Sequence, residues 1–436
     1  MAYPDFTPAR DCVSCGLCLP HCPTYRERPF EMASPRGRIQ LIKGLATGEL
    51  TGYEALDEHL SLCLACRACE SACPSAVKFG SLIESARAVL NDRLAPSWGR
   101  RLGAFFMRHV FPHQRRLAAV AALMRAYQAS GLQRLFRETP LRGCFPERIV
   151  ELESMMPEMS PLGEMPAPRG ELEPYGVERG RVGFLTGCVM QLAMASTNAA
   201  SMDVLRFNGL RVVLPREQRC CGALHLHNGF IPEARALARA NIAAFEEAGV
   251  DWIVTNQAGC GSTLKEYGKL LDDEPDWAGR AEAFRGRVRD INELLVELGL
   301  RPPSGRLALR AVYDDPCHLV HGQKIKAQPR QLLRAIPGLE LAEAREADWC
   351  CGSAGIYNVT HTEMSLAILQ RKMDDLLSTR PDVIVTSNPG CAFQLRYGAR
   401  RAGHAVQVVH VMDLLARSYR GEGAGLDRSA TKGEPS

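Results

Sequence analysis

The sequence predicts an α+β chain in which a small helical domain comes first and two copies of an α/β unit follow. Three observations support this prediction. Eight of the 17 cysteines fall in two short, equally spaced runs within residues 12–73. Eight more recur at matching intervals between residues 188 and 391. Strand-like and helix-like segments alternate around this second group, as they do in units built on a parallel sheet.

Length and composition describe an ordinary globular chain. It has 436 residues, 46% hydrophobic and 23% charged, which is enough for two or three buried cores. The net charge of +4 is too small to indicate nucleic-acid binding. The first ten residues resemble no secretory signal, and the eight-residue apolar run 117–124 is far shorter than a membrane span. We expect a cytoplasmic protein, at most peripheral on the inner face of the cell membrane.

The N-terminal cysteines form two copies of one motif. The copies run Cys12-x2-Cys15-x2-Cys18-x3-Cys22-Pro23 and Cys63-x2-Cys66-x2-Cys69-x3-Cys73-Pro74. This is the bacterial ferredoxin spacing, in which three thiolates bind one [4Fe–4S] cube and the fourth binds the other cube. We therefore expect two [4Fe–4S] clusters. The first would be held by Cys12, Cys15, Cys18 and Cys73, and the second by Cys63, Cys66, Cys69 and Cys22.

Paired zinc sites are the alternative for these cysteines, but zinc sites typically use two C-x2-C pairs without the fourth cysteine and proline. Small loop residues such as Ser14 and Ala65 let backbone N–H groups approach the sulfurs and tune the potential. Segments 35–42 and 56–62 are expected to be helical, so residues 1–96 form a ferredoxin-like helical domain. Arg36 and Arg38 either lie near the clusters or only solvate a helix start.

Two connecting segments follow. Residues 97–142 hold nine Arg and one Glu, with apolar residues at helical spacing, and are predicted to be a helical connector. Its basic face could meet a membrane or an acidic partner, but a solvated helical hairpin is the favoured interpretation. Residues 143–180 contain six prolines and are predicted to be a linker. Cys144, within it, is expected to have no chemical role.

The C-terminal half repeats itself, in units expected at residues 181–303 and 304–420 before a disordered tail, 421–436. The first unit has Cys188, Cys220-Cys221-Gly222 and Cys260. The second has Cys317, Cys350-Cys351-Gly352 and Cys391. Strands are predicted at 181–186, 211–214 and 252–255, with a helix at 232–248. Each cysteine follows a predicted strand, so the four thiols of a unit should converge at the carboxyl edge of a parallel sheet.

This convergence indicates a metal or redox site in each unit, or one shared between the units. Buried structural cysteines are the alternative, although four cysteines repeated in register argue against it. Four nearby histidines could be further ligands or proton donors, but single histidines are more often simply packed; these are His225, His227, His318 and His321.

Taken together, the two ferredoxin runs and the two CCG units resemble cysteine-rich oxidoreductase subunits. The most similar family is that of glycolate oxidase iron–sulfur subunits. The resemblance covers residues 10 to about 418 and includes the blocks Cys15-Gly16-Leu17-Cys18, Pro35-Arg36-Gly37-Arg38-Ile39 and Cys350-Cys351-Gly352-Ser353-Ala354-Gly355. It implies a complex with FAD-binding subunits that oxidise glycolate to glyoxylate, from which the clusters pass electrons to a quinone-type acceptor. This chain itself has no G-x-G-x-x-G after a strand to bind flavin.

One departure bears on the chemistry. Heterodisulfide-reductase-type units end in C-x2-C, whereas Thr263 and Gln394 occupy the final positions here. Each unit thus has four cysteines rather than five, which argues against disulfide reduction and leaves open a further cluster, zinc or no metal. Subunits of lactate, glycerol-3-phosphate or heterodisulfide-type enzymes are alternative functions. A self-contained catalytic subunit, whose C-terminal cysteines reduce a disulfide or bind quinone directly, and then a zinc-bound docking module follow.

Overall fold

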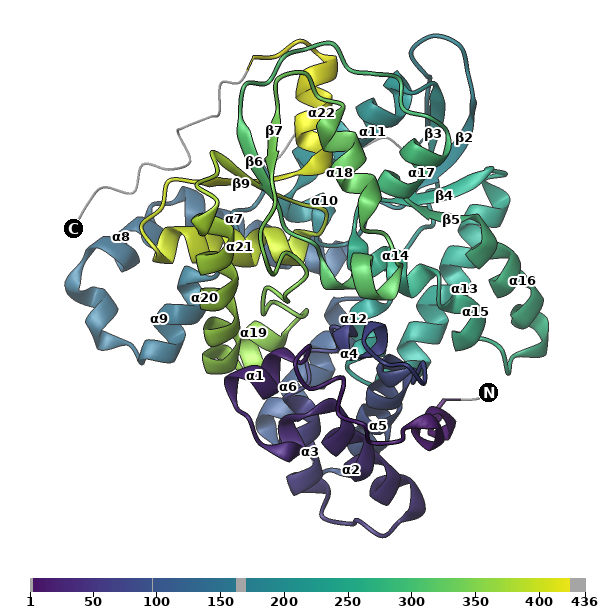
Figure 1. Cartoon of the computed structure of the whole chain (residues 1–436), viewed down its shortest axis with the longest axis vertical. Helices are drawn as coiled ribbons and strands as arrows, with labels where there is room; N and C mark the ends of the chain where they lie inside the picture. The colour runs from purple at the N-terminus through teal and green to yellow at the C-terminus, as the bar shows by residue number, and fades with distance from the viewer. Residues whose placement is uncertain (1–2, 96, 162–169, 424–436) are drawn as a thin grey trace.

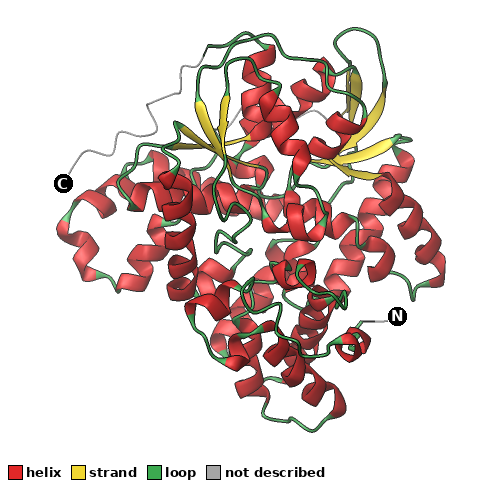
Figure 2. Ribbon diagram, in the orientation of Figure 1, coloured by secondary structure: helices red, strands yellow, loops and turns green. Residues whose placement is uncertain are grey.

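The computed structural model describes residues 3–95, 97–161 and 170–423. A helical N-terminal domain packs beneath two α/β units, each with its own sheet (Figure 1; Figure 2). The predicted α+β class is confirmed. The expected disordered tail lies outside the described residues, apart from 421–423.

The N-terminal domain wraps short helices around the two cysteine loops. The expected helices at 35–42 and 56–62 are present as α2 and α3. Ser34 caps α2 by accepting from the Gly37 N–H, and Pro35 takes the first helical position, where its missing N–H costs nothing. The elements are η1 (Thr7–Asp11), α1 (Pro23–Glu27), η2 (Glu31–Ala33), α2 (Pro35–Thr47), α3 (Tyr53–Ser61), α4 (Ala68–Ser71) and α5 (Phe79–Arg93).

The connector is helical, as predicted, but it extends further than expected. A helix, α9, occupies part of the segment predicted to be a linker, and a short strand, β1, lies later in the same segment. The charged, Pro-flanked stretch after Pro146 supplies the start of the helix. The elements are α6 (Trp98–Phe105), η3 (Phe106–Val110), α7 (Gln114–Ala129), α8 (Leu132–Glu138), η4 (Pro140–Cys144), α9 (Glu147–Ser154) and β1 (Gly170–Leu172).

The first unit has the sheet order β1-β3-β2-β4-β5, parallel except for β1. Its strands and main helix match the predicted segments. The elements are β2 (Gly180–Phe184), α10 (Met190–Ala193), α11 (Ala195–Phe207), β3 (Leu210–Leu214), α12 (Ala223–His227), α13 (Ile231–Glu247), β4 (Trp252–Thr255), α14 (Ala258–Leu264), α15 (Tyr267–Leu270), α16 (Pro275–Arg287), β5 (Val288–Asp290) and α17 (Ile291–Glu297).

The second unit repeats this order as the all-parallel sheet β7-β6-β8-β9. The repeat reaches the caps, because Asp290 and His410 each begin a capping box on the helix that follows the last strand. The elements are β6 (Arg310–Tyr313), η5 (His318–Gly322), α18 (Ala327–Arg334), β7 (Glu340–Ala342), α19 (Tyr357–Thr360), α20 (Thr362–Ser378), β8 (Val383–Thr386), α21 (Pro389–Arg401), β9 (Gln407–His410) and α22 (Val411–Tyr419).

The two units share one hydrophobic core. Helix α11 packs on α22, and α17 packs on α18, so that side chains from both sheets meet between the units (Figure 1). Val182, Val254 and Val385 all belong to this core and are fully buried. The carboxyl edges of both sheets are directed toward the N-terminal domain, because cysteines that follow strands of both units line one cavity with residues of that domain. None of the helices in the described parts of the chain is long and apolar enough to span a bilayer.

Candidate functional site

The two ferredoxin loops adopt matching backbones. Ser14 and Ala65 are left-handed, with φ of 56° and 54°, and so are Gly16 and Arg67, with φ of 84° and 65°. Such curled backbone directs N–H groups inward. In the second loop the Ala65 N–H already donates to Cys63 Sγ at 3.3 Å. Both loops thus have the shape and the donors needed around cluster thiolates.

The loops also bring together the thiols that the spacing assigned crosswise. A small cavity is lined by Cys12, Cys15 and Cys18 of the first motif and by Cys73 with Pro74 of the second; Cys69 borders it too. We call Cys12, Cys15, Cys18 and Cys73 the first set. The second set is Cys22, Cys63, Cys66 and Cys69, of which Cys22 and Cys63 are buried.

The second set is chemically suited to a metal cluster. Burial raises the pKa of Cys66 and Cys69 well above the usual range, and charges on neighbouring thiols, Cys22 and Cys63 among them, raise it further. Thiolates packed this tightly need a cationic centre to offset their charge, and iron supplies one. The residues therefore fit the [4Fe–4S] group that their spacing predicts.

The two arginines lie at the cluster loops rather than only at a helix start. Arg36 donates to the Ser14 carbonyl at 3.3 Å and borders the first set. Arg38 is 1% exposed, donates to Thr24 at 2.9 Å and lies 3.8 Å from Cys22 Sγ. A buried cation beside this sulfur would favour the reduced, more negative form of a cluster bound there.

Each α/β unit brings its four cysteines together, as predicted. In the first unit Cys188 Sγ lies 3.6 Å from Cys220 Sγ, and Cys221 Sγ lies 3.0 Å from Cys260 Sγ. We call these four the unit-1 set, and the four equivalent residues, Cys317, Cys350, Cys351 and Cys391, the unit-2 set. All eight line one cavity of about 1240 Å³ between the units, the N-terminal domain and the connector.

Glycines place the double cysteines. Gly222 and Gly352 follow them with φ of 82° and 84°, a left-handed turn that other residues rarely adopt. A Cβ on Gly352 would stand 2.6 Å from the Ser365 carbonyl oxygen, whereas one on Gly222 would reach only ordinary contact with Ala234 at 3.5 Å. The second turn is therefore the tighter of the two.

Hydrogen bonds among the thiols of each set lower the pKa of one member. Hydrogen bonds from Cys188 and Cys221 lower the pKa of Cys220 well below the usual range. In the unit-2 set, hydrogen bonds from Cys350 and Cys391 do the same for Cys351. One thiol in each set is thus readily deprotonated, as metal binding or thiol chemistry requires.

The second ferredoxin loop is seated on the second unit, a contact that spacing alone does not predict. His318 Nε2 lies 3.0 Å from the Ala65 carbonyl oxygen, and the Tyr357 hydroxyl donates to the Leu62 carbonyl at 3.0 Å. Cys66 packs in one apolar cluster with Cys317. The second set therefore lies directly beside the unit-2 set.

The positions that depart from the five-cysteine pattern have structural roles. Thr263 donates to the Gly259 carbonyl at 3.3 Å, and Gln394 donates to Ser365 Oγ at 2.9 Å. Both side chains are buried. The described residues supply four thiols to each unit site and no fifth.

The four histidines mostly bind protein groups rather than cysteines. His225 lies 2.7 Å from the Met107 carbonyl oxygen, and His321 lies 3.0 Å from Ser71 Oγ. His227 and His318 line the large cavity with ring centroids 4.9 Å apart. Cys144 is exposed at the end of η4, away from all four sets.

Two ferredoxin-type motifs followed by paired cysteine-rich units define an iron–sulfur electron-transfer protein. Family models match in the same order: a 4Fe-4S dicluster domain at 8–77, the linker region of glycolate oxidase iron–sulfur subunits at 98–156, and cysteine-rich domains at 182–265 and 311–396. The chain belongs to the family of glycolate oxidase iron–sulfur subunits.

Individual relatives agree with this assignment. The chain is 43% identical to the probable glycolate oxidase iron–sulfur subunit of Bacillus subtilis, over 93% of both chains. It is 33% identical to the glycolate oxidase iron–sulfur subunit of Escherichia coli, over 92% of this chain and 93% of that one. A hypothetical protein from Helicobacter pylori shares the fold, with a TM-score of 0.55 and 9% identity, covering 87% of this chain and 66% of that one.

Proposed function

We propose that this chain carries electrons from FAD-binding partner subunits, which oxidise glycolate to glyoxylate, to a quinone-type acceptor. The observation that carries the proposal is the row of cysteine sets. Cys15 of the first set is exposed, Cys22 and Cys63 of the second set are buried, and Cys66 of that set adjoins Cys317 at the wall of the large cavity. A flavin yields two electrons together, and clusters pass them on singly.

The same geometry supports the ligand assignment. Cluster one is assigned to the first set and cluster two to the second set. The unit-1 and unit-2 sets are assigned to a further redox centre, with four thiols each in place of five. Zinc in those sets, or bare thiols, would retain the ferredoxin assignment and shorten the electron path.

Glycolate-dependent bleaching tests the proposal. The complex is isolated anaerobically from its native host, and cluster absorption is followed after glycolate, lactate or glycerol 3-phosphate is added. We expect bleaching with glycolate and little with the other two, since flavin reduction on the partner feeds the clusters. Clusters that dithionite reduces but glycolate does not would refute the glycolate assignment.

We also propose peripheral attachment to an anionic membrane through the connector. Trp98, Leu102 and Phe105 share one face of α6 and are 78%, 42% and 54% exposed, in a segment rich in Arg. Apolar side chains beside arginines suit a lipid interface. The favoured solvated-hairpin interpretation rests on the apolar residues of α7, which are mostly half-buried, and does not cover these exposed α6 side chains.

Vesicle binding tests this attachment. The complex should co-sediment with phosphatidylglycerol vesicles more than with phosphatidylcholine vesicles, and Trp98→Ser/Leu102→Ser should lose the difference. Val177→Ser, at an equally exposed side chain of the first unit, is the control. If the connector variant sedimented with anionic vesicles as well as the wild type does, or if it lost a partner subunit, this face would contact protein instead of lipid.

A further inference from the structure

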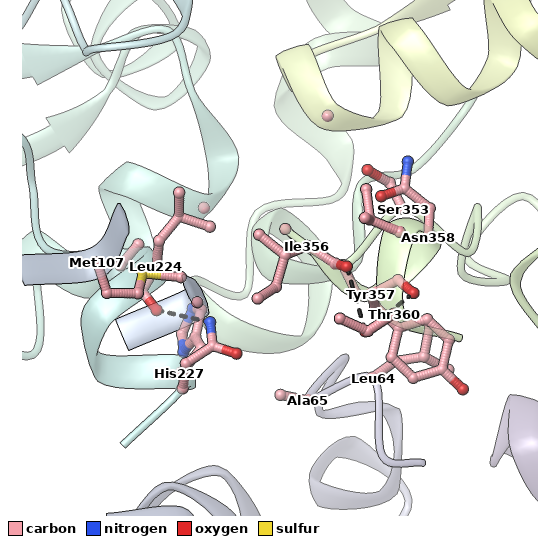
Figure 3. Close-up of a pocket in the computed structure, with 18 of the residues that line it drawn as sticks. Leu64, Ala65, Met107, Leu224, His227, Ser353, Ile356, Tyr357, Asn358 and Thr360 are labelled. Carbon is pink, nitrogen blue, oxygen red and sulfur yellow. Dashed lines mark hydrogen bonds between the residues drawn. The ribbon is translucent and has the colours of Figure 1, made fainter. Parts of the chain in front are cut away.

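The large cavity has walls suited to an organic ring. Away from the cysteines it is lined by apolar side chains from four parts of the chain, including Leu64, Met107, Leu224 and Ile356 (Figure 3). Its volume of about 1240 Å³ exceeds that of common small-ligand sites. A few polar groups face each other across it, with His227 on one side and Asn358 on the other (Figure 3). This composition favours a flat, apolar molecule with one or two polar atoms.

His227 presents an unused polar atom at this wall. Its Nδ1 lies 2.7 Å from Glu84 Oε1, whereas its Nε2 is buried and has no hydrogen-bond partner among the described residues. A buried nitrogen without a partner is costly and uncommon in folded proteins. Nε2 is enclosed by protein atoms, whereas the His227 ring borders the cavity, so a bound molecule would complete this hydrogen bond after a shift of the side chain.

Behind His227 lies a path for protons. The side chain of Glu84 is 5% exposed, and its Oε2 lies 3.3 Å from the hydroxyl of the half-buried Tyr3. Burial raises the pKa of Glu84 to about 7 and lowers that of His227 to about 4. The other groups that face His227 are the charged Arg67, Arg87 and Glu266 and the ring of His318. A neutral imidazole thus adjoins a carboxyl group whose pKa is raised toward neutrality.

We propose that the cavity binds a quinone-class acceptor and that His227 donates a proton from Nε2 to its carbonyl oxygen, with Glu84 resupplying Nδ1. The proposal rests on the proposed function for the source of electrons. The quinone gains two electrons and two protons, and each C=O becomes C–OH. As the Nε2–H bond breaks and the O–H bond forms, the carboxyl proton of Glu84 moves to Nδ1. Water supplies the second proton to the other carbonyl oxygen and reprotonates Nε2, after which the Nδ1 proton returns to the Glu84 carboxylate.

The test compares two oxidants on the intact complex, with clusters reduced by glycolate or, separately, by dithionite. Menadione needs protons as well as electrons, whereas ferricyanide takes one electron and no proton. In His227→Gln we expect reoxidation by menadione to slow by about a hundredfold or more, in the range of general acid catalysis. Its solvent deuterium isotope effect should vanish, and reoxidation by ferricyanide should be unchanged. Glu84→Gln should slow reoxidation by menadione less than His227→Gln does, and it should flatten the pH dependence of that rate between pH 6 and 8. His404→Gln, at an exposed histidine, is the control.

Three results would overturn the proposal. If menadione reoxidised both site variants at the wild-type rate, His227 would not be the proton donor. Wild-type clusters that menadione cannot oxidise would exclude a quinone site. Equal slowing with both oxidants would mean that the variants disturb the clusters instead. Clusters that dithionite reduces but glycolate does not would count against the proposed function alone, because the dithionite arm still tests His227.

Discussion

The buried ion pair behind the unit-2 set makes a quantitative prediction. Lys372 Nζ lies 2.7 Å from Asp314 Oδ1, and the two side chains are 0% and 1% exposed. Lys372 also donates to the Ala347 carbonyl at 2.6 Å. In the first unit, Leu185 occupies the position equivalent to Asp314. Asn241 occupies the position equivalent to Lys372. The same backbone therefore tolerates an uncharged pair.

Replacing one partner should be far worse than replacing both. Lys372→Met leaves the carboxylate buried without a cation, which costs about 3–5 kcal/mol. Lys372→Met/Asp314→Leu removes both charges and should cost only about 1–2 kcal/mol, chiefly because the Thr386 hydroxyl loses its acceptor at 2.8 Å. Lys326→Met, which breaks an exposed pair with Asp348, is the control and should cost at most about 1 kcal/mol.

Hydrogen exchange of the β6 and β8 amides measures this difference locally, which suits a multidomain chain better than one global midpoint. A loss of 3–5 kcal/mol accelerates exchange roughly a hundredfold to several thousandfold. The double variant should show about a tenfold acceleration. A single variant that exchanges no faster than the double variant would refute the argument, because the buried carboxylate would then need no cation.

Three further predictions address turns, titration and ligands. Gly352→Ala should lose more iron and more stability than Gly222→Ala, since only the former meets backbone within 3 Å; equal losses by iron assay and thermal unfolding would contradict this. Burial lowers the pKa of His410, so the unfolded chain binds its proton more readily. Stability should therefore be greatest above about pH 6.5 and fall below it, by at most about 1.4 kcal/mol per pH unit for this group. Thermal unfolding between pH 7.5 and 5.5 should show a weaker dependence of stability on pH in His410→Asn than in the wild type. The same dependence in both proteins would exclude His410 as its source. Cys66→Ala should abolish cluster two and acceptor turnover but leave the partner flavin reducible. The control, Cys144→Ala, should match the wild type. Acceptor turnover of Cys66→Ala at the wild-type rate would refute the electron path.

Cysteine spacing was enough to predict which thiols gather within each domain. The carboxyl ends of parallel strands meet at one edge of a sheet, so the sequence alone predicted that Cys188 and Cys260 lie close together. The crosswise grouping of Cys73 with the first motif likewise follows from how short the loop between the third and fourth cysteines is.

Contacts between domains could not be predicted in this way. Ala65 and His318 are 253 residues apart, and neither periodicity nor motif spacing relates them. The pairing of His227 with Glu84 is equally remote, because each residue alone suggests only an ordinary helix position. Strand β1 was missed because three residues pairing antiparallel at a sheet edge leave too little pattern to recognise.

The shared core between the units also decides which parts of the molecule can give way. Closely packed interiors deform little, so the two units act as one rigid frame and the spacing between their cysteine sets stays constant whatever occupies the cavity. The connector forms the remaining wall, where Met107 of η3 is buried but none of the described residues of α6 is. Molecules should therefore enter and leave by local opening of the connector, without disturbing the distances on which electron transfer depends.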